Sequence, residues 1–165
     1  MIKTKPIIRS AQEADIQDVS KLYSYVTTLH RQRGHSETLA AIQDDLHKKH
    51  IRFFVAESME GIVGFLKLNL YQHKEDKQCV CRDYGYIPAI AVAPHHHRRG
   101  IGSQLLQHGE QWLQRFNVNV IELHVAEFNR QAIACYKNLR YITIERGKHN
   151  RRMVKYIPHN QWDKH

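Results

Sequence analysis

The hydrophobic pattern changes its period between residues 87 and 116, and the change predicts a strand followed by a helix. Apolar residues run almost unbroken from Ile87 to Pro94, which is typical of a strand covered on both faces and stopped by a residue without an N–H. Apolar residues then recur at helical spacing, at Ile101, Leu105, Leu106, Trp112, Leu113 and Phe116. We therefore expect the helix to begin near Gly100.

Short apolar runs and amphipathic stretches alternate along the rest of the chain. Strands are predicted over residues 7–9, 51–58, 62–71, 84–92, 118–125, 141–145 and 153–157. Helices are predicted after a capping-box sequence at residues 10–13, over residues 36–50 and over residues 129–138. The apolar positions expected on the buried faces of the first two are Ile16, Val19, Leu22, Tyr23, Val26, Leu29, Leu39, Ile42 and Leu46.

Neither an internal repeat nor a linker interrupts this order, so we expect one domain over residues 1–165 with a core of about residues 7–157. The strand, helix and strand around Gly100 would form a right-handed parallel crossover in a mixed α/β structure. Residues 146–152 are expected to form a loop between the last two strands.

The small number of cysteines and the lack of a long apolar run indicate a protein of a reducing compartment. A chain of 165 residues needs no disulfide or metal staple, and its three cysteines are too few for a disulfide framework. The chain has neither a signal-peptide segment at its N-terminus nor an apolar run as long as a membrane span. A cytoplasmic protein is the expectation.

Charge adds a second constraint, because 25 Lys and Arg residues against 16 acidic residues give a formal net charge of +9. Such a balance favours an anionic partner, which could be nucleic acid, an acidic protein or a phosphate-bearing small molecule. The run His95-His96-His97 contributes basic residues but is not expected to bind metal. Consecutive side chains point to alternate sides, and no nearby carboxylate or Cys-x-x-Cys completes a ligand set.

Gly100 and Gly102 leave backbone amides unshielded at the predicted helix N-terminus, where an anion is favoured. A Walker A loop would require Lys and then Ser or Thr after the last glycine, but Ser103 and Gln104 follow Gly102. A dinucleotide fingerprint would require Gly or Ala where Leu105 stands. Neither of these two phosphate loops fits.

The strand end Val92-Ala93-Pro94 and the loop His97-Arg98-Arg99-Gly100-Ile101-Gly102 resemble the acyl-CoA loop of the GNAT acetyltransferase family. The family pattern is Arg/Gln-x-x-Gly-x-Gly/Ala after a strand that ends in Val-x-Pro. His97 stands where the family prefers Arg or Gln, a residue that acts largely through its backbone amide.

Residues 129–141 resemble the downstream motif of the same family, Asn-x-x-Ala-Ile-x-Leu-Tyr-x-x-Leu-Gly-Phe. Tyr141 replaces Phe conservatively, whereas Arg140 replaces a glycine that usually ends the helix in a left-handed conformation. Arg140 therefore implies either mild strain or a different helix ending. The two motifs occur in the family's order, and the resemblance covers nearly the whole chain.

The resemblance implies a central mixed, mostly antiparallel sheet of six to seven strands, about four flanking helices, and a splay at the strand that holds acyl-CoA. It implies that acetyl-CoA donates an acetyl group to a primary amine of a small molecule or protein, which attacks the thioester directly. The pantetheine arm would pair with residues 90–92 and the pyrophosphate would meet the amides of residues 97–103. The expected cofactor-binding residues are Ile90, Ala91, Val92, His97, Arg98, Arg99, Gly100, Ile101, Gly102, Ser103, Asn129 and Tyr136.

The resemblance also assigns catalytic groups. Tyr136 would act as the general acid toward the leaving CoA thiolate, or else pack its ring between helix and sheet. A backbone N–H near Val92 would stabilise the developing oxyanion. Asn129 would either contact the CoA arm or cap its helix.

The general base is left open, because Pro88 and Ala89 occupy the positions where many relatives carry a glutamate. The candidates are Glu122, His124, Asp83 and Tyr84, or a proton path relayed by water, which is the preferred hypothesis.

Three other questions stay open at this point. The chain could bind acyl-CoA without turnover, or it could be a basic nucleic-acid-binding module, although no recognition helix, zinc finger or basic stripe with aromatic residues is visible. Nothing in Tyr23, Tyr25, His30 or Arg33 selects the acceptor amine. A homodimer is an assembly common in the family.

Overall fold

The computed structural model describes residues 4–26, 38–72 and 82–158. The strands in these residues are β1 (Ile7–Ser10), β2 (Ile51–Ser58), β3 (Gly61–Tyr71), β4 (Tyr84–Val92), β5 (Val120–Ala126), β6 (Ile142–Arg146) and β7 (Asn150–Tyr156). The helices are α1 (Ile16–Leu22), α2 (Leu39–Leu46), α3 (Ile101–Gln114) and α4 (Arg130–Asn138). Single 3-10 turns, η1 (Glu13–Asp15), η2 (Tyr23–Tyr25) and η4 (Pro94–His96), stand beside α1 and before α3.

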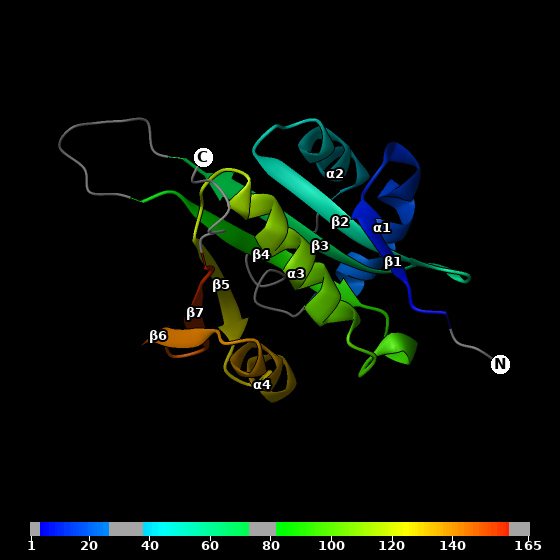
Figure 1. Cartoon of the computed structure of the whole chain (residues 1–165). Coiled ribbons are helices and arrows are strands. Elements are labelled where there is room, and N and C mark those ends of the chain that lie inside the picture. Colours follow the sequence, from blue (N-terminus) through cyan, green and yellow to red (C-terminus); the bar gives the residue numbers. More distant parts are fainter. Residues whose placement is uncertain (1–3, 27–37, 73–81, 159–165) are drawn as a thin grey trace.

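All seven strands form one sheet in the order β1-β2-β3-β4-β5-β7-β6 (Figure 1). Every neighbouring pair is antiparallel except β4 and β5, which are parallel and are joined by the crossover through α3. The sequence prediction of a mixed, mostly antiparallel sheet with four flanking helices is therefore confirmed.

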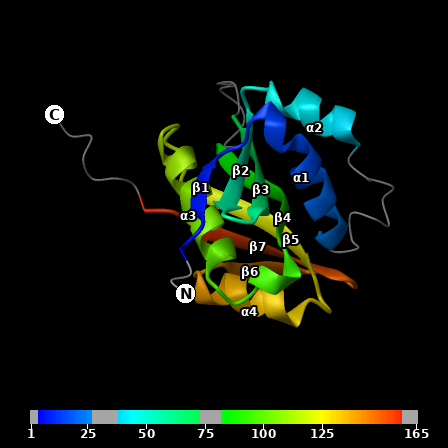
Figure 2. The same cartoon turned by 90° about the vertical axis from the view of Figure 1, so that its right-hand side faces the viewer.

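The helices cover both faces of the sheet (Figure 2), with α1 and α2 on one face and α3 on the other. Because side chains alternate along a strand, β2 and β3 supply both cores at once. Phe53 and Phe65 pack in the core with α1 and α2, whereas Leu66 and Leu68 pack in the core with α3. Within the described residues, no helix is long and apolar enough to cross a membrane.

The helix-spaced positions of α3 are buried as predicted, with the exception of the last. Ile101, Leu105 and Leu113 are at most 2% exposed, whereas Phe116 is 39% exposed because α3 already ends at Gln114. In the first two helices the prediction holds for Ile16, Val19, Leu22 and Ile42. It is wrong for Leu39, which is exposed at the first position of α2, and Leu29 lies outside the described residues.

Two element boundaries differ from the prediction. Ser10 does not cap the first helix, because it is the last residue of β1 and pairs with Phe54. The helical turns begin instead at Glu13, where the N–H of Gln12 donates to the carboxylate of Asp15 at 2.8 Å. Similarly, Thr38 caps α2, so this helix is shorter than the predicted residues 36–50, of which 36 and 37 lie outside the described residues.

The expected loop over residues 146–152 is much shorter, because β6 runs to Arg146 and β7 starts at Asn150. The basic side chains of Arg151, Arg152 and Lys155 in β7 form ion pairs with carboxylates of neighbouring segments. Arg151 donates to both carboxylate oxygens of Glu127 at 2.6 and 3.0 Å, and its backbone pairs with Val125. Polar composition therefore misidentified a strand that is stabilised by ion pairs.

Arg140 adopts the left-handed conformation of the glycine that it replaces, with φ of 70°. The N–H of Tyr141 donates to the carbonyl of Tyr136 and the N–H of Arg140 donates to the carbonyl of Lys137, both at 2.9 Å. These two bonds form a Schellman ending of α4. Of the two alternatives left open, mild strain with the usual helix ending is the one observed.

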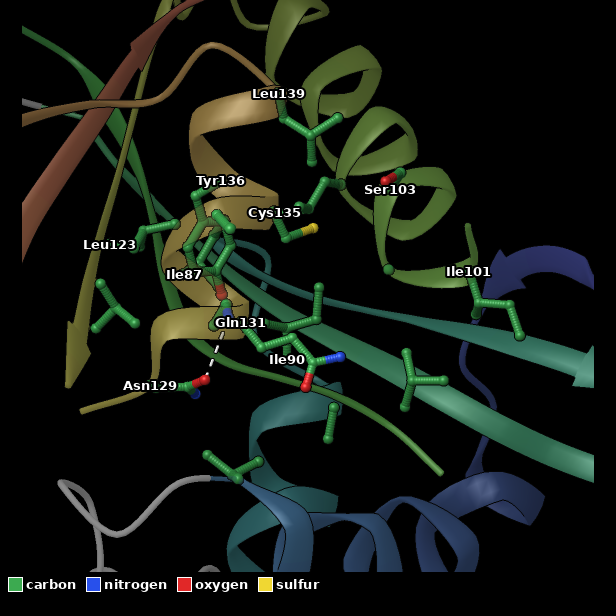
Figure 3. Close-up of a pocket in the computed structure, with 18 of the residues that line it drawn as sticks. Ile87, Ile90, Ile101, Ser103, Leu123, Asn129, Gln131, Cys135, Tyr136 and Leu139 are labelled. Atoms are coloured by element: carbon green, nitrogen blue, oxygen red, sulfur yellow. Dashed lines mark hydrogen bonds between the residues drawn. The ribbon is translucent and has the colours of Figure 1, made fainter. Parts of the chain in front are cut away.

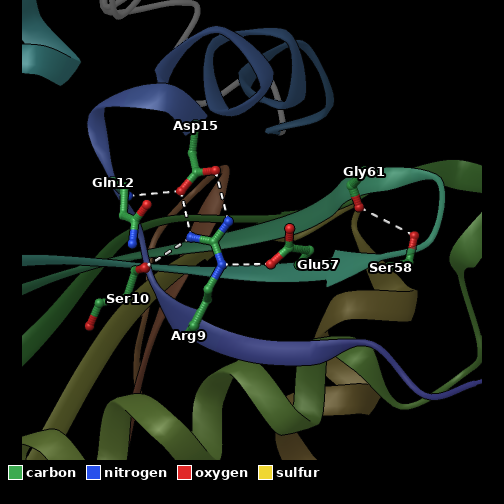
Figure 4. Close-up of polar contacts among 7 residues, drawn as sticks. All are labelled: Arg9, Ser10, Gln12, Asp15, Glu57, Ser58 and Gly61. Atoms are coloured by element: carbon green, nitrogen blue, oxygen red, sulfur yellow. Dashed lines mark hydrogen bonds and ion pairs between the residues drawn. The ribbon is translucent and has the colours of Figure 1, made fainter.

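An ion-pair network ties β1 to the start of α1 (Figure 4). The guanidinium of Arg9 donates to both oxygens of Asp15 at 2.7 and 3.0 Å, and its Nε donates to Glu57 of β2 at 2.7 Å. The hydrogen bonds from Arg9 lower the pKa of the Asp15 carboxyl by more than burial raises it. The ionised form of Asp15 therefore stabilises the folded state.

We expect Asp15→Asn to lower the free energy of unfolding at pH 7 by about 2 kcal/mol, since it removes charge-assisted hydrogen bonds to a buried carboxylate. The pKa of Asp15 is lower in the folded state than in the unfolded state, so its contribution is complete above about pH 5 and disappears as the pH falls through the folded value. Urea unfolding from pH 7 to pH 2 should show the difference between wild type and variant narrowing below about pH 4.

Asp18→Asn is the matched control, because Asp18 pairs with Lys21 at the surface and should contribute less than about 0.5 kcal/mol. A difference between wild type and Asp15→Asn that stayed constant down to pH 2 would contradict this interpretation.

Candidate functional site

Strands β4 and β5 pair over only three residues and then separate. Their parallel register joins Gly85, Tyr86 and Ile87 to Ile121, Glu122 and Leu123 and extends no further along the described strands. The next residue of β4 is Pro88, which has no N–H to donate to a neighbouring strand. The register with β3 also shifts here, because Ala89 pairs with Lys67 whereas Tyr86 pairs with Asn69. This bulge bends β4 at the point where pairing with β5 stops.

The second half of β4 consequently presents backbone groups to the open side. The N–H of Ala93 donates to Val63 of β3 at 2.8 Å, so by alternation Ala91 and Ala89 also face β3. The backbone groups of Ile90 and Val92 must then face the gap toward β5. An extended molecule in this gap would meet a row of donors and acceptors like those at a sheet edge.

The glycine loop leads from β4 to the N-terminus of α3 and ends in that gap. Gly100 is the N-cap of α3 with φ of 75°, a left-handed conformation that suits glycine. No side chain caps α3, and the amides of Ile101, Gly102 and Ser103 precede the first helical hydrogen bond, which Gln104 donates to Gly100. These amides and the helix dipole favour an anion at this end of the gap.

One pocket of about 740 Å³ connects the gap, the glycine loop and α4 (Figure 3). Its volume lies in the usual range of small-molecule sites. It is lined by every predicted cofactor-binding residue except Arg99, namely Ile90, Ala91, Val92, His97, Arg98, Gly100, Ile101, Gly102, Ser103, Asn129 and Tyr136. The fold thus brings together predicted residues from β4, the loop, α3 and α4 that are far apart in the chain.

The three adjacent histidines contact different groups. The Nε2 atom of His97 lies 2.6 Å from the carbonyl of Val92, and the N–H of His97 donates to Pro94 at 3.2 Å. His96 is buried against Glu60 and Arg99, whereas His95 is exposed. Since the His97 amide is already engaged, the amides that stay available for an anion begin after it.

Tyr136 is buried at the inner end of the pocket, on the face of α4 that looks toward β4 and β5. Burial raises the pKa of its hydroxyl above the ordinary value, with a smaller contribution from Cys135. The hydroxyl forms no hydrogen bond with any described residue and is therefore available to a ligand. Its ring centroid lies 5.6 Å from that of Tyr141, whose buried hydroxyl has no hydrogen-bond partner among the described residues.

Asn129 is the N-cap of α4, and its Oδ1 accepts from the N–H of Ala132 at 3.1 Å (Figure 3). Of the two alternatives for this residue, capping is the one observed. The amide nitrogen of the same side chain is a donor that the cap does not use, and Asn129 lines the pocket, so contact with a ligand is compatible with capping.

The four candidate bases occupy different surroundings. His124 lines the pocket, and its Nδ1 lies 3.2 Å from the hydroxyl of Tyr86. The carboxylate of Glu122 forms an ion pair with Arg152, whose Nε lies 2.8 Å away. The Nε–H of Arg152 does not point at the carboxylate oxygen, so the pair lacks a hydrogen bond through this atom. Tyr84 stacks on Tyr71 at a centroid distance of 5.0 Å, and burial raises the pKa of its hydroxyl. Neither Glu122, Tyr84 nor Asp83 lines the pocket, so only His124 joins the cofactor residues.

Sequence reasoning missed several lining residues, of which Gln131, Cys135 and Leu139 are examples. Cys135, a free cysteine, stands one position before Tyr136, and Leu139 stands three positions after it, and both line the pocket. Helical spacing from Tyr136 could have identified Leu139. The contact of His124 with Tyr86 could not have been found in this way, because the two residues lie on different strands.

The comparisons with known proteins agree with this geometry. The model of the acetyltransferase (GNAT) family matches residues 19–141, which is most of the chain. No curated protein sequence matches significantly.

Solved structures of acetyltransferases share the fold at low sequence identity. An N-acetyltransferase PaiA from Thermoplasma acidophilum, in complex with coenzyme A, has a TM-score of 0.76 at 13% identity over 93% of this chain and 99% of its own. The ribosomal-protein-S18-alanine N-acetyltransferase of Escherichia coli has a TM-score of 0.70 at 18% identity over 96% and 98%. An aminoglycoside 6′-N-acetyltransferase from Acinetobacter haemolyticus has a TM-score of 0.69 at 20% identity over 86% and 94%.

Proposed function

The chain belongs to the GNAT family of N-acetyltransferases, and we propose that it transfers an acetyl group from acetyl-CoA to a primary amine of a small molecule or protein. One observation carries this proposal. The part of β4 that does not pair with β5, the uncapped N-terminus of α3 and the buried Tyr136 hydroxyl all line one pocket. A cytoplasmic location is proposed with it, which the free Cys135 thiol supports.

The pocket offers each part of acetyl-CoA a complementary group. Both backbone groups of Ile90 and the N–H of Val92 would hydrogen-bond the pantetheine arm, as a neighbouring strand would, whereas the Val92 carbonyl already contacts His97. The amides of Ile101–Ser103 would bind the pyrophosphate, and Arg98, which lines the pocket, would add a positive charge. The acidic ligand would thereby neutralise part of the chain's basic excess.

Attack by the acceptor nitrogen forms a bond to the thioester carbonyl carbon, and loss of the sulfur follows. A backbone N–H of the parted β4 strand near Val92 is placed to donate to the oxyanion that forms. The leaving group is the CoA thiolate, whose conjugate acid has a pKa near 8.5 for a free thiol. Because the pKa of the Tyr136 hydroxyl is raised, Tyr136 is protonated at neutral pH and stabilises this thiolate by donating a hydrogen bond.

The acceptor must lose its ammonium proton before attack, because a free alkyl amine has a pKa near 10.4. His124 is the proposed end of this proton path, since it lines the pocket and its Nδ1 contacts the hydroxyl of Tyr86. Water between the amine and His124 would complete the path. The acceptor stays open, because two acetyltransferases of similar fold are named for different acceptors, a ribosomal-protein alanine and an aminoglycoside.

We predict that Gly102→Glu abolishes CoA binding measured by calorimetric titration, because its carboxylate would repel the pyrophosphate at the helix N-terminus. The fold should survive, since a Cβ at Gly102 meets no atom of the described residues within 4 Å. Gly102→Ala is the matched control and should retain CoA binding within about threefold of wild type. A folded wild type that fails to bind CoA would contradict the proposed function.

We predict that Tyr136→Phe lowers kcat by about 10- to 100-fold and leaves KM for acetyl-CoA nearly unchanged, because the hydroxyl interacts with charge that develops only in the transition state. Thiol release from acetyl-CoA measures both constants. Tyr141→Phe is the matched control, and it should leave kcat unchanged and raise the free energy of unfolding by about 1 kcal/mol, since it removes an unpartnered buried hydroxyl. Equal kcat values for Tyr136→Phe and wild type would exclude the acid role.

We predict that His124→Gln lowers kcat/KM for the acceptor by about 10- to 100-fold at pH 7, because the proton path loses its titratable end. Glu122→Gln should change kcat/KM by less than about threefold, since Glu122 does not line the pocket. The opposite order of effects would assign the base to Glu122 and overturn the proposed path.

A further inference from the structure

Arg99 belongs to the glycine loop, yet its guanidinium is held by another side chain. It is the one predicted cofactor-binding residue that does not line the pocket. Its NH1 lies 3.4 Å from the Nδ1 of His96, and the Nε2 of His96 lies 2.9 Å from the carboxylate of Glu60. Glu60 stands in the turn between β2 and β3, so this chain of contacts joins the glycine loop to a hairpin 36 residues away.

The direction of the hydrogen bonds follows from the groups involved. A guanidinium can only donate, so the Nδ1 of His96 accepts from Arg99. The remaining proton of the neutral imidazole must then lie on Nε2 and be donated to Glu60. His96 is only 7% exposed, and both of its ring nitrogens are therefore satisfied within the protein.

The backbone between these contacts is strained. Arg98 has φ of 61°, a left-handed conformation that a residue with a side chain adopts only when its surroundings hold it there. On one side of Arg98, the ring of His97 contacts the carbonyl of Val92 at 2.6 Å. On the other side, Arg99 is held through His96 to Glu60.

We propose that Glu60, His96 and Arg99 are positioning residues that hold the glycine loop in its anion-binding form. In this proposal Arg99 does not contact phosphate; it fixes the strained turn at Arg98, so that the amides of Ile101–Ser103 point into the pocket before CoA arrives. The proposal rests on the proposed function, because it concerns the affinity of the same CoA site. Preorganisation of this kind is expected to affect binding and not the chemical step.

A double-mutant cycle distinguishes positioning from direct contact. Arg99→Met and His96→Phe should each weaken CoA binding about fivefold to tenfold in calorimetric titration, and the double variant should bind no more weakly than either single variant. kcat should stay within about twofold of wild type, and the salt dependence of CoA binding should be unchanged, since no phosphate contact is lost. The exposed neighbour His95 supplies the matched control, and His95→Phe should bind CoA like wild type.

Further weakening when Arg99→Met is added to His96→Phe, together with a shallower salt dependence, would overturn the proposal and make Arg99 a direct phosphate ligand. Wild-type affinity in both single variants would overturn it as well. If His96→Phe fails to fold, Glu60→Leu replaces it in the cycle with the same expectation, because it removes the acceptor for His96. A wild type that does not bind CoA would instead refute the proposed function.

Discussion

β4 and β5 can pair only as far as Ile87 and Leu123, and the rest of the site depends on that limit. Pro88 supplies no N–H, and the bulge opposite Leu68 bends the strand at the same point. Backbone groups that would otherwise complete a sheet therefore face a pocket. The crossover helix α3 begins beside the open end, so its uncapped amides and the free edge of β4 lie in one pocket.

Several basic side chains bind carboxylates of other elements and therefore have a structural role. Lys67 is 5% exposed and lies 2.6 Å from Asp45 of α2. Lys155 donates to both oxygens of Glu110 at 2.8 and 2.9 Å, and Arg9 and Arg151 likewise bind carboxylates. These ion pairs hold helices and strands together, and because each pair uses one acidic and one basic group, the net charge of +9 is carried by the other basic residues.

The fold was largely predictable because its apolar periods are unambiguous. The apolar runs of β2 and β3 and the helical stripe of α3 identified these elements, and the fold shows the two cores to which they contribute. Failures occurred where a tertiary contact overrides a local signal. Ser10 belongs to β1 because it pairs with Phe54, and Arg151 belongs to β7 because Glu127 neutralises it. Both partners are far away in the sequence, so a rule that uses only neighbouring residues cannot take them into account.

The residues of the site also divide into those that local motifs predicted and those that depend on contacts between different elements. Motif spacing identified Gly102 and Tyr136, since each lies in a contiguous segment that reaches the pocket as a unit. The contacts of His96 with Glu60 and of His124 with Tyr86 join different elements, so they became visible only in the folded chain.

Hydrogen exchange of individual β4 amides, followed by NMR with and without saturating CoA, tests most directly whether the parted strand holds the cofactor. Exchange at Ile90 and Val92 should slow when CoA binds, because their N–H groups face the gap and gain partners. Exchange at Ala89 and Ala91, which face β3, should change little. Unchanged exchange at Ile90 and Val92 in the CoA-bound protein would contradict a backbone-paired pantetheine arm.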